Sequence, residues 1–251
     1  MNGQSEQQAL EKRFAELSAR AERRGCYTFT PFLDLAQQSV LRAMERRLPL
    51  PPLWFGGYDG AERQLACFGR PEQVGAPPAP PIVCLQVKAK NERFARALGH
   101  RDLLGAVMAL GVKRELIGDI LPRGKGGYLF CLEEIGEYLC AQLTEVGSAA
   151  VTCTPCAGPE GALCQPVPET VISASLRLDG LIAAVWDLSR SESAGLFPKQ
   201  LVFVNGRGVL SPGENARPGD IVSVRGRGRF RLEGVSGETR KGRLRVTVAR
   251  Y

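Results

Sequence analysis

The sequence has no long hydrophobic run and only one histidine, His100. Its longest apolar stretch, "LLGAVMALGV" (103–112), is far too short to span a bilayer. The first residues, "MNGQSEQQALEKRFAEL", lack the apolar centre of a secretory signal peptide. We therefore predict a cytoplasmic protein whose eight cysteines are reduced thiols.

The single histidine lies in "GHRDLLG" (99–105), whose letters match the start of the H-R-D-L-x-x-x-N catalytic loop of protein kinases. That loop needs an asparagine to hold a second metal ion, and Val107 occupies its position. The D-F-G aspartate and the glycine-rich strand with a paired lysine are also missing. These absences exclude a protein kinase.

Other catalytic and cofactor motifs are incomplete. "GRGRFR" (226–231) lacks the last glycine of a dinucleotide-binding loop, and "GDILPRGKGG" (118–127) has the wrong spacing for a P-loop. Cys153, Cys156 and Cys164 supply three thiols, but no second spaced pair and no nearby histidine complete a zinc site. We therefore assign no cofactor, no metal and no catalytic residue.

Positive charge is concentrated near the end of the sequence. Residues 225–250 contain nine Arg and Lys against two Glu, which equals the net charge of +7 of the whole chain. A basic segment of this kind suits a polyanion, either nucleic acid or an anionic membrane surface. No amphipathic basic helix or lipidation motif accompanies it, so nucleic acid is favoured.

The apolar pattern predicts an α+β fold in three parts. The N-terminal lobe, 1–76, has helices at 6–24 and 31–47 and strands at 53–57 and 64–69. After the linker "GAPPAPP" (75–81), a middle lobe at 82–154 has the β-α-β-β-α-β order of ferredoxin-like folds. Its elements are strand 82–89, helix 100–110, strands 116–121 and 128–132, helix 133–146 and strand 149–154. A linker at 155–168 leads to a third unit, 169–251.

The first turn of the 100–110 helix contains His100 and Arg101, with Asp102 placed against the positive end of the helix dipole. Helix capping and packing explain the histidine more simply than catalysis does, because it has no catalytic partner. Contact with RNA is the alternative.

The third unit has a helix with apolar Leu178, Leu181, Ile182 and Val185, and then Ser189 with Glu192 as a capping pair. Strand "LVFVN" (201–205) and a turn at Asn205-Gly206 follow. This segment resembles an S4 RNA-binding domain. The matching positions are Arg177, Leu178, Asp179, Ser189-Arg190-Ser191, Lys199, Val204-Asn205-Gly206 and Pro218-Gly219-Asp220.

The resemblance extends to nearly the whole chain. "TPFLDLAQQSVL" (30–41), "HRDLLGAVMALGVKRELIGDIL" (100–121) and "TRKGRLRVTV" (239–248) are similar to the YlmH-type S4-domain proteins of bacteria and plastids. The resemblance implies a non-enzymatic protein that binds ribosomal RNA near peptidyl-tRNA and aids rescue of stalled nascent chains. A link to cell-division genes is another family trait. The chain departs from many S4 domains at Ala194-Gly195, where an arginine pair is usual.

Two arginine-rich stretches are predicted to form a basic ribbon. As a strand, "RGRGRFR" (225–231) would carry Arg225, Arg227, Arg229 and Arg231 on one face. In "KGRLRVTV" (241–248) Lys241, Arg243 and Arg245 would share one face and apolar residues the other. A row of guanidinium groups suits phosphates. The alternative is a solvated face that only prevents edge-to-edge pairing.

We therefore predict a monomeric protein that binds structured RNA, namely the ribosomal RNA of the large ribosomal subunit, tRNA, or both, without membrane contact. The alternatives are an RNA-modifying enzyme with an added S4 domain and a protein-interaction adaptor in cell division. A secondary RNA contact is predicted for His100, Arg101, Lys113 and Arg114. The main predicted RNA-binding residues are Arg177, Arg190, Lys199, Asn205, Arg207, Arg225, Arg227, Arg229, Arg231, Lys241, Arg243 and Arg245.

Overall fold

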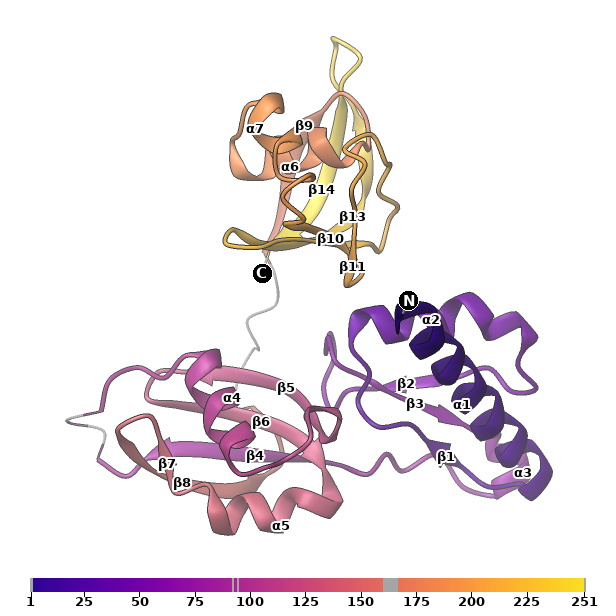
Figure 1. Ribbon diagram of the computed structural model, residues 1–251, viewed down its shortest axis with the longest axis vertical. Coiled ribbons are helices and arrows are strands. Elements are labelled where there is room, and N and C mark those ends of the chain that lie inside the picture. Colours follow the sequence, from indigo (N-terminus) through magenta and orange to yellow (C-terminus); the bar gives the residue numbers. More distant parts are fainter. Residues whose placement is uncertain (1, 92, 94, 160–166, 251) are drawn as a thin grey trace. The chain divides into compact units, whose positions relative to one another are not determined.

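The computed structural model describes residues 2–91, 93, 95–159 and 167–250. The chain divides into two compact units, residues 1–163 and 164–251. Both units combine helices with antiparallel sheets, as Figure 1 shows. Among the helices of the described residues, none is long and apolar enough to cross a bilayer. The finer division at 1–76, 82–154 and 169–251 stays a prediction.

The first part of unit 1 packs helices on a small sheet. Asp34 caps one of these helices by accepting a hydrogen bond from Gln37 N at 2.9 Å, and the Gln37 side chain accepts one from Asp34 N. Phe14, Leu41 and Phe68 are buried between the helices and the sheet, whose strand order is β1-β3-β2. The elements are α1 (Asn2–Arg24), β1 (Thr28–Phe29), α2 (Leu35–Met44), the 3-10 helix η1 (Glu45–Arg47), β2 (Leu53–Phe55), β3 (Leu65–Phe68) and α3 (Pro71–Val74).

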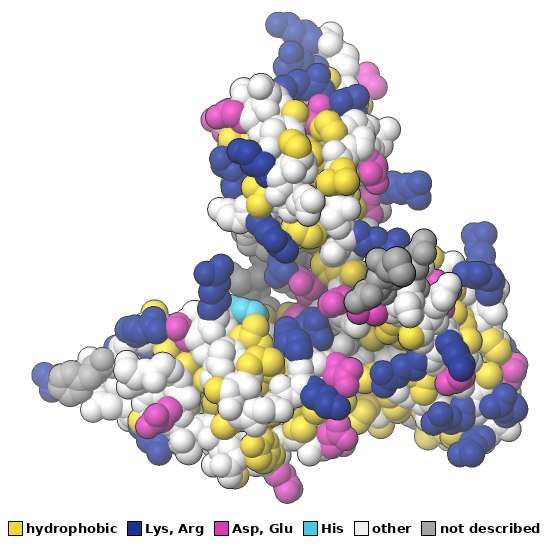
Figure 2. Space-filling model, in the orientation of Figure 1, with side chains coloured by type: hydrophobic (Ala, Val, Ile, Leu, Met, Phe, Trp, Pro, Cys, Tyr) yellow, Lys and Arg dark blue, Asp and Glu magenta, His cyan; other side chains and the backbone are white. Residues whose placement is uncertain are grey.

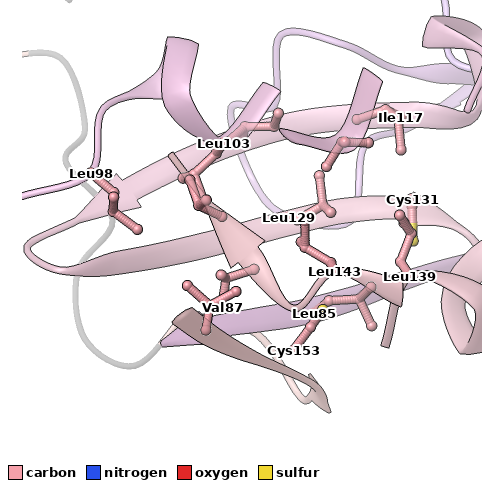
Figure 3. Packing of buried hydrophobic residues seen from close by; sticks show 14 residues of the cluster. Leu85, Val87, Leu98, Leu103, Ile117, Leu129, Cys131, Leu139, Leu143 and Cys153 are labelled. Atoms are coloured by element: carbon pink, nitrogen blue, oxygen red, sulfur yellow. The ribbon is translucent and has the colours of Figure 1, made fainter. Parts of the chain in front are cut away.

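The second part of unit 1 is a sheet covered by two helices. Its strand order is β5-β6-β4-β8-β7, with antiparallel neighbours throughout. Leu103 and Leu139, one from each helix, point toward Leu85 and Leu129 of the sheet (Figure 3). The elements are β4 (Ile82–Ala89), α4 (His100–Ala109), η2 (Arg114–Leu116), β5 (Ile117–Arg123), β6 (Gly126–Leu132), α5 (Glu133–Gln142), β7 (Glu145–Val146) and β8 (Ala149–Cys156).

The helix predicted at 133–146 is wrong in its last four residues, because α5 ends at Gln142. Val146 belongs to β7 and pairs with Ala149 across a two-residue turn, in which Gly147 has a φ of +61°. Leu143 and Val146 are both buried in the core, as a helix would also have required. Their spacing alone therefore could not distinguish a helix from a chain that turns back as a hairpin.

A hydrogen-bond network joins β5 to the loop before β3. The carboxylate of Asp119 accepts from the Tyr58 hydroxyl at 2.7 Å and from the backbone N–H groups of Glu62 and Arg63 at 2.7 and 3.0 Å. The Arg63 guanidinium donates to the Ile117 carbonyl at 2.9 Å, and burial lowers the pKa of Arg63. The network fixes the two sheets of unit 1 against each other.

We expect Asp119→Ala to lower the free energy of unfolding by about 2–4 kcal/mol, because three donors lose a charged acceptor. Urea unfolding followed by circular dichroism measures the change. Asp59→Ala is the matched control, since Asp59 is exposed nearby. Equal stability of the two variants would contradict a structural role for this carboxylate.

Unit 2 packs two short helices on one face of a six-stranded sheet with the order β11-β10-β12-β13-β14-β9. Its first strand, β9, pairs with its last strand, β14, and β9 is absent from the predicted elements. The elements are β9 (Val167–Ser173), α6 (Leu178–Trp186), α7 (Arg190–Ala194), β10 (Val202–Val204), β11 (Arg207–Gly208), β12 (Ile221–Val224), β13 (Gly228–Glu238) and β14 (Leu244–Arg250).

The predicted pairing of two strands, with Leu244, Val246 and Val248 on an apolar face, is confirmed, but the predicted row of arginines along 225–231 is wrong. Residues 225–227 form the turn between β12 and β13, since Val224 pairs with Gly228, and only Arg229 and Arg231 lie on β13. Gly226 has a φ of +83°, a value that favours glycine and a turn. Lys241 and Arg243 likewise lie in the turn between β13 and β14. The row of charges is therefore split between the two ends of β13.

Candidate nucleic-acid interface

The first turn of α6 is tied to the segment 211–216. The backbone N–H of Leu178 donates to the Glu214 carbonyl at 2.8 Å, and that of Asp179 donates to the Pro212 carbonyl at 3.1 Å. These bonds satisfy two of the N–H groups that a helix start leaves without a partner. The start of α6 is thereby held in place by a loop that is distant in sequence.

Asp179 organises this first turn. The Arg177 guanidinium donates to both carboxylate oxygens at 3.1 Å, and the Gly180 N–H donates to one of them at 2.8 Å. These bonds, led by that from Arg177, lower the pKa of Asp179. The Ser193 hydroxyl donates to the Asp179 carbonyl at 2.7 Å and so ties α7 to α6.

Arg177 and Arg190 both lie close to a glycine near the first turn of α6, and only the approach of Arg177 to Gly213 is tighter than an ordinary contact. A Cβ at Gly213 would lie 3.2 Å from Nη1 of Arg177, and a Cβ at Gly180 would lie 3.6 Å from Nη2 of Arg190. Arg190 is the first residue of α7 and is exposed. Arg177 and Arg190 are thus brought together around the first turn of α6, as a joint RNA contact requires.

The predicted cap of α7 is confirmed. The Glu192 N–H donates to the Ser189 hydroxyl at 3.2 Å, and the Ser189 N–H donates to the Glu192 carboxylate at 2.9 Å. Hydrogen bonds from Ser189 lower the pKa of Glu192, and the charge of nearby Arg227 contributes to the shift. Arg227 therefore lies on the α7 side of unit 2.

The other predicted residues of unit 2 differ in what they contact. Arg225 stacks over the Phe203 ring at 4.7 Å. The Asn205 amide donates to Asp220 at 2.8 Å and accepts from Ile221 N at 2.9 Å. Asn205 also has a φ of +48° in the predicted turn, so its side chain serves the turn itself. The predicted residues that are exposed are Lys199, Arg207, Arg225, Arg227, Lys241, Arg243 and Arg245, whereas Arg229 and Arg231 are half-buried on β13.

The hairpin of β13 and β14 ends in a basic tip, which we define as Arg240, Lys241, Arg243 and Arg245. All four side chains are exposed. Figure 2 shows dark blue Lys and Arg side chains gathered where this hairpin projects. Arg240 was missed as a site residue because the predicted alternation began after it, although the charge of the segment includes it.

The secondary residues of unit 1 do not form one group. His100 and Arg101 are exposed on the first turn of α4, where Asp102 accepts from Gly99 N at 2.8 Å. That hydrogen bond is the main reason why the pKa of Asp102 is lowered. Arg114 instead donates to the Ile117 and Gly118 carbonyls, and burial lowers its pKa to about 10. Its guanidinium is therefore turned toward the protein backbone, whereas Lys113 is exposed.

The described part of the chain offers few side chains that could bind a metal ion. The seven cysteines described there are free thiols, and Cys164 lies outside the described residues. Within the same ranges, no group of three or more His, Cys, Asp or Glu side chains could hold a metal ion.

Known proteins are similar to this chain. The chain is 34% identical over 227 residues to the "Ribosome-associated protein quality control protein P2" of Bacillus subtilis (strain 168), covering 88% of this chain and 86% of that protein. The family model described as "Putative RNA-binding domain in YlmH" matches residues 82–158. The chain belongs to the YlmH family. The solved structure "Cell division protein ylmH from Streptococcus pneumoniae" is 16% identical, with a TM-score of 0.49, and covers 60% of this chain and 91% of that chain.

We expect Asp179→Asn to reduce the sensitivity of unit 2 to acid. Because the folded protein lowers the pKa of Asp179, its contribution to stability is complete above the unfolded value of about 4 and is lost as the pH falls through the lower, folded value. Urea unfolding between about pH 5 and pH 2, followed by Trp186 fluorescence in a Trp54→Phe background, measures this loss.

Asp187→Asn is the matched control for this experiment, since it removes an exposed carboxylate of the same unit. The wild type and Asp187→Asn should lose more stability on acidification than Asp179→Asn does. Equal losses in all three proteins would show that the bond from Arg177 does not favour the charged carboxylate.

Proposed function

We propose that this protein binds structured RNA of the large ribosomal subunit, with or without tRNA, and acts in quality control of stalled nascent chains. In this proposal unit 2 is an S4 RNA-binding domain, α6 and α7 dock on the RNA, and the basic tip adds phosphate contacts. The protein works as a cytoplasmic monomer. Membership of the YlmH family, and the printed name of the Bacillus relative, support the ribosomal partner.

The observation that carries the proposal is the pair of guanidinium groups around the first turn of α6. Arg177 uses two of its N–H groups on Asp179, and its fork has five. Its side chain is 44% exposed, so the remaining donors can reach a phosphate. Arg190 and Arg227 lie within the electrostatic range of the same helix pair, through Asp179 and Glu192.

We propose further that the protein is not an enzyme. The "RLD" sequence (177–179) invites comparison with the catalytic aspartate of pseudouridine synthases. The Asp179 side chain is only 9% exposed, and both of its oxygens accept hydrogen bonds from Arg177. Burial and these hydrogen bonds give the carboxylate a structural role at the start of α6, which argues against catalysis.

A salt titration tests the proposed division of the RNA contact. We expect neutralising the basic tip to glutamine to cut the log–log slope of affinity against salt by about 3, because about four phosphate contacts are lost. Arg190→Ala should weaken binding to purified large subunits about tenfold and binding to a random RNA hairpin less. Arg190 is preferred to Arg177, whose loss would leave Asp179 buried without its partner.

The control for the titration removes four exposed arginines of unit 1, Arg20, Arg23, Arg46 and Arg47, and so matches the change in net charge. This control variant should keep the wild-type slope within about 1. A basic-tip variant that binds with the wild-type slope would contradict the phosphate contact. Absence of any binding by the wild-type protein would overturn the proposed function.

The non-enzymatic proposal predicts that a deletion strain keeps every modified RNA nucleoside. Nucleoside mass spectrometry of its ribosomal RNA and tRNA is the measurement. Loss of one modified nucleoside, restored by the wild-type gene but not by Asp179→Ala, would instead establish an RNA-modifying enzyme.

A further inference from the structure

The second part of unit 1 is nearly neutral, but its charges are segregated. Residues 82–158 contain nine Arg and Lys against eight Asp and Glu. Seven of the nine basic residues fall within 88–102 and 123–126, where only two acidic residues occur, for a net charge of +5. We call these seven the basic pole: Lys88, Lys90, Arg93, Arg96, Arg101, Arg123 and Lys125.

The fold brings the two stretches together at one end of the sheet. Lys88 on β4 lies opposite Gly126 on β6. The Ala89 N–H donates to the Lys125 carbonyl at 3.1 Å, and the Leu98 N–H donates to the Gly124 carbonyl at 2.9 Å. The end of β4, the turn between β5 and β6 and the start of α4 therefore form one surface.

The turn that presents Lys125 is fixed by glycine. Gly124 has a φ of +58°, which favours glycine at the first position of a two-residue hairpin turn. A Cβ at Gly126 would lie 2.1 Å from the Val87 carbonyl oxygen, so β4 and β6 approach closely here. The basic pole thus has a defined shape, unlike a charged tail.

All seven side chains of the basic pole are exposed. Asp102 is already engaged there by Arg96 and by Gly99 N, each at 2.8 Å. The large exposed hydrophobic residues of the described chain are Leu53, Tyr138, Ile172, Leu210 and Val235, all outside the pole. The surface therefore has the charge that a phosphate backbone requires and lacks apolar groups for insertion into a membrane.

We propose that the basic pole is the face of residues 82–158 that takes the phosphate backbone of a structured RNA. This inference rests on the proposed function, and it assigns to particular residues the RNA contact of a region that matches the family's putative RNA-binding domain. Lysine and arginine in a fixed arrangement without base-reading groups give affinity and position rather than sequence selection.

Salt titration and lysine protection test the proposal on the full-length chain. The pole variant replaces Lys88, Lys90, Arg123 and Lys125 with glutamine, and the matched control is the Arg20, Arg23, Arg46 and Arg47 variant. With a 24-base-pair RNA hairpin as probe, the pole variant should lose about 3 from the log–log slope and the control within about 1. Bound hairpin should also protect Lys88, Lys90 and Lys125 of the wild type from acetylation, and leave exposed Lys12 reactive.

The outcomes separate the two proposals. One outcome overturns the RNA contact of the basic pole and leaves the proposed function standing. In that outcome the log–log slope of affinity against salt falls for the basic-tip variant but not for the pole variant, and Lys88, Lys90 and Lys125 stay reactive. If wild type binds no RNA, both fail. Loss of binding to phosphatidylglycerol vesicles or to a poly-glutamate peptide in the pole variant, with RNA binding unchanged, would overturn the inference in favour of those partners. Lysine protection can be read on wild type even if the pole variant does not fold.

Discussion

The Asp179 carboxylate is the group on which the proposed interface of unit 2 depends. It holds the Arg177 guanidinium by two bonds and accepts from the first turn of its own helix. The backbone carbonyl of the same residue receives the Ser193 hydroxyl, so α7, and with it Arg190, is placed relative to α6. Asp179 therefore fixes the positions of both Arg177 and Arg190. Its negative charge is needed to hold the Arg177 guanidinium, and so to give the positive surface a defined shape.

The net charge of the chain does not reveal the basic pole. Residues 225–250 have a net charge of +7, which equals that of the whole chain, so the charges of the remaining residues cancel. Cancellation along the sequence does not imply cancellation in space, because a hairpin turn and a strand end can bring two basic stretches together while the acidic residues lie elsewhere. Since exposed charges interact mainly within about 10 Å at 0.1 M salt, the local balance decides what a surface attracts.

The sequence predicted most helices and strands, and it failed where two structures satisfy one pattern. The α6 helix and the cap of α7 follow from apolar spacing and from Ser189 with Glu192, both local signals. Leu143 and Val146 suited a helix as well as a hairpin, and alternating arginine and glycine suited a strand as well as a turn. The roles of Asn205 and Arg114 depend on partners that only the fold supplies, so no local signal could reveal them.

How firmly each arginine side chain is held in the folded protein affects whether it contributes to overall affinity or to discrimination between RNA shapes. An arginine side chain has about 2 kcal/mol of rotamer entropy to lose when it is held in one place. Arg177 loses part of that freedom on folding, through Asp179 and the close approach of Gly213, so less remains to be lost when RNA binds. Three of the four basic-tip residues lie in the turn between β13 and β14, and Arg245 follows on β14. In the proposed interface the contribution of the basic tip is mainly release of counterions. In the proposed interface, discrimination between RNA shapes therefore belongs to Arg177 and Arg190, because only groups with fixed positions lose affinity when the phosphates are displaced.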